Sequence, residues 1–111
     1  MRSLLLDELA PGDMDRLLEH LGRTLTTSGL PDVFWLEMPE DLLTPEQAAH
    51  RGSCGPHRVA VVVEEDSLRL ELLVRAQESL RCACTAYATT AQRDFLIDYL
   101  DRLIEELGLR T

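Results

Sequence analysis

The chain has 111 residues, the size of one domain, and a formal net charge of -9 at pH 7. This acidic balance argues against a nucleic-acid backbone or an anionic membrane surface as partner, because both are bound through clustered cations. We therefore expect a single domain over residues 1–111, with no nucleic-acid and no membrane partner. The acidity suits a basic protein partner instead.

The amino-terminal part is predicted to hold a helix and a strand. Residues 3–9 favour a short helical turn. Leucines at helical spacing then predict a helix over about 13–27, with Asp13 as its N-cap and Gly29 in the segment that ends it. Apolar and aromatic residues between two prolines predict a strand over 33–38.

Two capping boxes predict two further helices. Residues 44–47 read Thr-Pro-Glu-Gln, and the helix that they begin is expected to end before a loop over 51–56. Residues 89–92 read Thr-Thr-Ala-Gln and begin a longer helix that ends at Gly108.

Three strands are expected between these helices. Residues 57–64 are rich in valine, and residues 68–75 and 80–87 alternate between apolar and other side chains. The last of these would carry one face made of Leu80, Cys82, Cys84 and Ala86. The predicted fold class is α+β, with a three- to four-stranded antiparallel meander packed on one face by an N-terminal and a C-terminal helix.

Histidine and cysteine residues suggest a metal site. His50, Cys54 and His57 surround one glycine-containing loop, and Cys82 and Cys84 lie on the last predicted strand. These are ligands that zinc prefers, and zinc is the one cofactor that the sequence suggests. Alternate side chains on a strand lie about 6.6 Å apart, whereas two thiolates on one zinc lie about 3.8 Å apart. We therefore expect Cys82 or Cys84 as a ligand, but not both, unless the strand bulges. The alternative is that both are small core residues.

A second hypothesis is a small cysteine-dependent enzyme. Gly55 would give access to a Cys54 nucleophile, with His57 or His50 as its base. The chain carries no motif for an oxyanion hole or for a third residue that would orient the base.

The cysteines also bear on the compartment. Three cysteines at uneven spacing do not form the pattern of a disulfide framework. The apolar run from Leu4 to Leu6 is followed at once by acidic residues, unlike a secretory signal. We therefore expect a cytoplasmic location, where thiols stay reduced.

The outer face of the predicted sheet is the third candidate. If Val59, Val61 and Val63 point inward, an apolar stripe rimmed by arginines faces outward, and such a stripe is typical of an interaction site. The predicted interaction surface consists of Ala60, Val62, Arg69, Leu73, Arg81, Ala83 and Tyr87. Because no catalytic motif is present, the leading interpretation is a non-catalytic protein-interaction or binding module, with a homodimer as one form.

Overall fold

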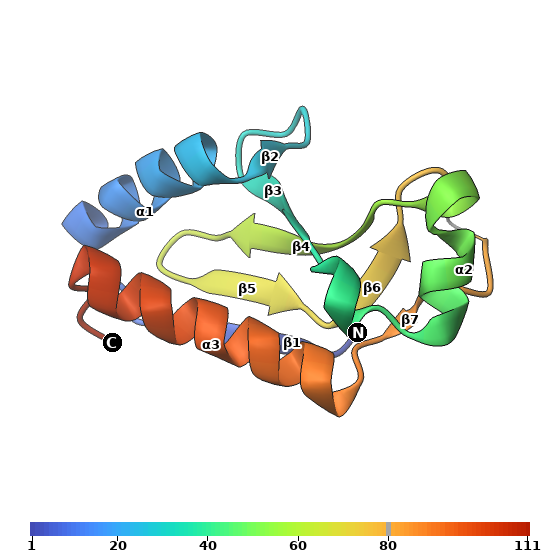
Figure 1. The fold of residues 1–111 in the computed structure, drawn as a ribbon. Helices are drawn as coiled ribbons and strands as arrows, with labels where there is room; N and C mark the ends of the chain where they lie inside the picture. The colour runs from blue at the N-terminus through green and yellow to red at the C-terminus, as the bar shows by residue number, and fades with distance from the viewer. Residues whose placement is uncertain (80) are drawn as a thin grey trace.

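The computed structural model describes residues 1–79 and 81–111 and shows an α+β fold (Figure 1). The described residues form seven strands, three α-helices and one short 3-10 helix. In chain order these are β1 (Ser3–Leu6), α1 (Pro11–Thr24), β2 (Thr26–Thr27), β3 (Val33–Glu37), η1 (Glu40–Leu42), α2 (Pro45–Cys54), β4 (His57–Val63), β5 (Leu68–Glu71), β6 (Leu73–Ala76), β7 (Ala86–Tyr87) and α3 (Thr90–Leu107). The predicted α+β class and antiparallel pairing are confirmed, whereas the prediction of three or four strands is wrong.

The sheet runs in the order β1-β5-β4-β3-β2, and β6 extends it by pairing with β4 and β7. Every pairing is antiparallel. Alternate residues of the strands form one hydrophobic core with buried residues of α1 and α3, so the terminal helices supply the cover of the core face. The fully buried members of this core are Leu17, Leu21, Val59, Val61, Leu68, Leu70, Val74, Leu96 and Leu103.

The strand predicted over 68–75 is interrupted at Leu72. Val61 of β4 lies opposite Leu70, but His57 lies opposite Ala76, so the register shifts by two residues between β5 and β6. Two extra residues on one strand make a β-bulge. Because the number is even, the alternation between core and outer face continues through the bulge, and Val74 and Ala76 remain fully buried.

The amino-terminal predictions need correction. Residues 3–6 form the edge strand β1 rather than a helical turn, because they pair with β5 along their whole length. Helix α1 begins at Pro11 after an Ala10 N-cap, so Asp13 lies in its first turn and is not the cap. There the Asp13 carboxylate accepts hydrogen bonds from Arg16 and from the backbone N–H of Arg110. Gly29, at φ 90°, follows β2 and does not cap the helix.

The third strand of the predicted meander is largely a turn. Its first position, Leu80, lies outside the described residues. The backbone N–H of Cys82 bonds the carbonyl of Ser79 at 3.3 Å, and that of Thr85 bonds the carbonyl of Cys82 at 3.0 Å. These local bonds take the place of ladder bonds, and the strand is confined to β7.

Both predicted capping boxes are present, and their glutamines are joined. Gln47 closes the box of α2 with Thr44, and Gln92 closes the box of α3 with Thr89. Both glutamines are buried, and the Gln92 Nε2 donates to the Gln47 Oε1 at 2.9 Å. The Gln47 Nε2 in turn donates to the carbonyl of Cys84 at 3.2 Å. The starts of α2 and α3 and the turn that holds Cys82 and Cys84, called the cysteine turn below, are therefore joined by one buried polar network.

Candidate metal centre

Helix α2 supplies two side chains to the site. His50 and Cys54 are four residues apart on this helix, so they lie on the same side of it. The loop predicted over 51–56 is therefore wrong in part, because the helix continues to Cys54 and only Gly55 and Pro56 redirect the chain. A Cβ atom at Gly55 would lie 2.6 Å from the carbonyl oxygen of Arg51, so glycine permits this close approach.

The turn before β7 supplies the other two side chains. The Sγ atoms of Cys82 and Cys84 lie 2.8 Å apart. The expectation that only one of them can be a ligand assumed a regular strand. The backbone turns here instead, so that geometric restriction does not apply. Cys84 is 1% exposed and packs with Cys54 and Ala76, whereas Cys82 is half-buried.

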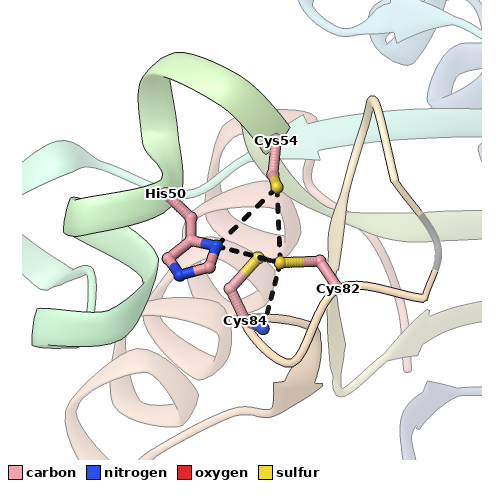
Figure 2. Close-up of side chains that lie close together, drawn as sticks. All are labelled: His50, Cys54, Cys82 and Cys84. Carbon is pink, nitrogen blue, oxygen red and sulfur yellow. Dashed lines mark hydrogen bonds between the residues drawn. The ribbon is translucent and has the colours of Figure 1, made fainter.

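Four potential ligand atoms meet between α2 and the turn (Figure 2). The Sγ atoms of Cys54, Cys82 and Cys84 and a ring nitrogen of His50 all lie within 4.8 Å of one another. The Cys82 sulfur is 3.3 Å from the Cys54 sulfur and 3.1 Å from the His50 Nδ1. The His50 Nδ1 is 3.8 Å from the Cys54 sulfur. The four residues thus form a group that can hold a metal ion.

The thiols of this cluster differ in acidity. The Cys84 thiol and backbone N–H and the Cys54 thiol all donate toward the Cys82 sulfur, and these bonds lower the pKa of Cys82 to about 7. Burial, followed by the hydrogen bond to Cys82, raises the pKa of Cys84 to about 12. One sulfur therefore carries negative charge most readily, and its neighbours are held as donors toward it.

His57 is the predicted ligand that the structure leaves out of the cluster. It is the first residue of β4, its side chain is 1% exposed, and its partner across the sheet is Ala76. Neither ring nitrogen has a hydrogen-bond partner among the described residues. Burial lowers the pKa of His57, with smaller contributions from His50 and Arg51, so the ring is favoured in its neutral form.

The geometry required of a Cys54 nucleophile is met only in part. The His50 Nδ1 lies 3.8 Å from its sulfur, within reach of a base. However, the Cys54 side chain is 8% exposed, and its sulfur also contacts Cys82, so Gly55 does not provide the open access that was expected.

The predicted interaction residues do not all lie on the sheet. Ala60 alternates with core valines and so belongs to the outer face, yet it is only 5% exposed, opposite Trp35. Leu73 lies opposite the exposed Tyr87. Val62 and Arg69 lie opposite each other on β4 and β5, and Arg81 and Ala83 belong to the cysteine turn rather than to a strand. The interaction surface stays a prediction.

A hollow of about 440 Å³ lies where α1 and α3 face each other. It is lined by His20, Tyr99, Arg102, Leu103, Glu105 and Glu106. Its basic and acidic groups are mixed, and the His20 Nε2 lies 3.8 Å from a Glu106 carboxylate oxygen. The hollow thus shows no charge preference for a ligand.

Comparison with protein-family models, with curated proteins and with solved structures finds no match. In residues 1–79 and 81–111, no helix combines the length and the apolar character that a membrane span requires. The functional argument therefore rests on the cluster itself.

Proposed function

We propose that the protein binds one zinc ion through His50, Cys54, Cys82 and Cys84, and that this ion is a structural element of the fold. The observation that supports the proposal is the convergence of all four ligand atoms to within 4.8 Å of one another. They come from two segments that are far apart in the sequence. A chance contact would bring together one cysteine and one histidine, whereas here all four side chains meet.

The donor set favours zinc over other common ions. Thiolates are soft ligands, and three of them with one imidazole form a Cys₃His set, which is a usual structural zinc site. Magnesium and calcium prefer oxygen ligands. On zinc, the sulfurs would lie about 3.8 Å apart, so Cys82, now 2.8 Å from Cys84 and 3.3 Å from Cys54, would move outward by about 1 Å. Its position in a half-buried turn permits this movement.

A site of this kind is closed to substrates. Four protein ligands complete a tetrahedral zinc ion, whereas a catalytic zinc keeps one position for water or substrate. The proposal therefore agrees with the non-catalytic role expected from the sequence. The ion would join the end of α2 to the turn before β7, and its charge would offset three thiolates held close together.

The test is native mass spectrometry of protein purified without chelator, combined with thermal unfolding before and after chelation. We expect one zinc per chain and a melting temperature that falls when zinc is removed, because metal that binds only the folded state stabilises it. The substitutions Cys54→Ser and Cys84→Ser should each abolish stoichiometric zinc. Ala48→Ser is the matched control, since Ala48 is exposed on the same helix and lies outside the cluster.

Two results would contradict the proposal. One is protein that is isolated without metal and whose melting temperature is unchanged by added zinc or by chelator. The other is zinc that persists in both cysteine variants, which would place the ion elsewhere in the chain.

A further inference from the structure

We propose that Cys82 is an oxidation site, at which hydrogen peroxide creates a Cys54–Cys82 disulfide and expels the zinc ion. This inference rests on the proposed zinc site for its metal-release step. Its disulfide step depends only on the thiols.

Access selects Cys82 as the thiol that reacts first. Cys54 and Cys84 are 8% and 1% exposed, whereas Cys82 is half-buried in the turn. An oxidant in solution therefore meets this sulfur before the other two. Cys82 also occupies the middle of the cluster, because both other sulfurs and the His50 Nδ1 are within 3.3 Å of its Sγ atom.

Backbone geometry selects Cys54 as its partner. The Cys84 sulfur is nearer, at 2.8 Å against 3.3 Å. However, Cys82 and Cys84 are separated by one residue, and so small a ring strains the dihedral angle near 90° that a disulfide requires. The Cys84 carbonyl is moreover held by Gln47. Cys54 lies on α2, 28 residues from Cys82 in the sequence, so a disulfide between these two residues does not close a small ring.

The reaction balances with peroxide as the oxidant. The Cys82 thiolate attacks one peroxide oxygen, the O–O bond breaks, and a sulfenic acid and hydroxide are formed. The Cys54 thiolate then attacks the Cys82 sulfur, the S–O bond breaks, and a second hydroxide leaves. Two thiolates lose two electrons in total, and the two peroxide oxygens gain them.

The zinc ion loses half of its ligands in this process. Only His50 and Cys84 remain free to bind it, and two protein ligands do not complete a structural site. A dithiol reductant restores both thiolates, and with them the site. Oxidation and metal binding are thus mutually exclusive states of the same residues.

Arginine positions make the disulfide easy to map. The chain has no lysine, so trypsin cuts only after arginine and releases Cys54 within peptide 52–58 and both other cysteines within peptide 82–93. Zinc-loaded protein treated with peroxide should give these two peptides joined, lighter by two hydrogens than their sum, with about one zinc released per joined pair. A free peptide 52–58 beside a peptide 82–93 with an internal disulfide would overturn the choice of Cys54.

Variants are compared as reduced, chelator-treated protein, so that their zinc affinity does not matter. Cys84→Ser should still join the two peptides, whereas Cys82→Ser should not. Cys54→Ser should instead accumulate a sulfenic acid at Cys82, trapped as a dimedone adduct. Joining in Cys82→Ser that matches wild type would refute the role of Cys82, and far-ultraviolet circular dichroism checks that each variant is folded.

The two proposals fail separately. If wild-type protein holds no zinc but still joins the peptides, the zinc proposal fails and the oxidation site stands. If it holds zinc and peroxide neither releases the ion nor joins the peptides, the oxidation site fails alone.

Discussion

Replacing Gln47 by leucine should destabilise the protein and weaken the proposed zinc site together. The Gln47 side chain is 1% exposed. Its Oε1 accepts from the Thr44 N–H at 3.1 Å and from the Gln92 Nε2 at 2.9 Å, and its Nε2 donates to the Cys84 carbonyl at 3.2 Å. Leucine is similar in size but makes none of these bonds, so both backbone groups lose this side-chain partner. Gln92 still bonds the carbonyl of Leu42 at 3.0 Å.

The magnitude follows from these two groups. The bond to the Cys84 carbonyl is buried, and a buried polar group left without a partner costs about 1–3 kcal/mol. The Thr44 N–H is only part-buried and should cost less, so the free energy of unfolding should fall by roughly 1–4 kcal/mol. With a urea dependence of about 1.5 kcal/mol/M, a loss of about 3 kcal/mol lowers the unfolding midpoint by about 2 M. Zinc affinity should fall as well, because the Cys84 backbone loses its anchor.

Urea unfolding of the zinc-free and zinc-loaded forms is the assay, with zinc competition against a chromogenic chelator beside it. Gln77→Leu is the matched control, since Gln77 is exposed, and it should change stability by less than about 0.5 kcal/mol. A loss below about 1 kcal/mol for Gln47→Leu, with zinc affinity unchanged, would refute the reasoning.

Three further predictions concern other parts of the molecule. Gly55→Ala should cost about 1–3 kcal/mol in urea unfolding, because its Cβ would lie 2.6 Å from the Arg51 carbonyl; stability equal to wild type would show that the helix end moves freely. The hydrogen bond from the Arg110 N–H lowers the pKa of Asp13 from 3.8. Its stabilisation is therefore present above pH 3.8 and is lost as the pH falls through the lower, folded-state value, so Asp13→Asn should be less stable at pH 7 and converge with wild type in acid; a gap that is constant with pH speaks against this. The predicted self-association implies that Leu73→Asp lowers the mass measured by light scattering to that of a monomer, whereas wild type that is already monomeric at high concentration rules out the homodimer.

Local signals in the sequence predict local structure well. The capping boxes that begin at Thr44 and Thr89 depend on residues three apart, and both are present. The strand over 33–38 and the valine-rich strand from His57 are likewise confirmed as β3 and β4. In each case the residues that form the sequence pattern also form the capping bonds or the buried face of the element.

Local sequence patterns do not predict which distant segments pair with each other. Residues 3–6 become a strand only because β5 lies beside them, with Leu5 opposite Arg69. Alternation over 80–87 resembles a strand, but bonds such as that from Thr85 to the Cys82 carbonyl make it a turn. A regular strand would keep the Cys82 and Cys84 sulfurs apart, whereas the turn brings them to 2.8 Å from each other.

The residue types of the site were recognisable from the sequence, whereas its membership was not. Four of the five predicted ligands meet, and His57 does not, because its place at the start of β4 commits its side chain to the interior. The helical i,i+4 spacing of His50 and Cys54 was the available signal, and using it required extending the predicted helix through Gly52 to Cys54.

The two-residue register shift at Leu72 also limits how this chain can change in length. Each residue gained or lost there exchanges the faces of everything that follows in β6, so changes of one residue would turn Ala76 away from Cys54 and Cys84, which it contacts. Changes of two residues would leave the faces as they are. We therefore expect insertions and deletions in this segment to be tolerated in pairs, with parity deciding whether the cysteine cluster forms.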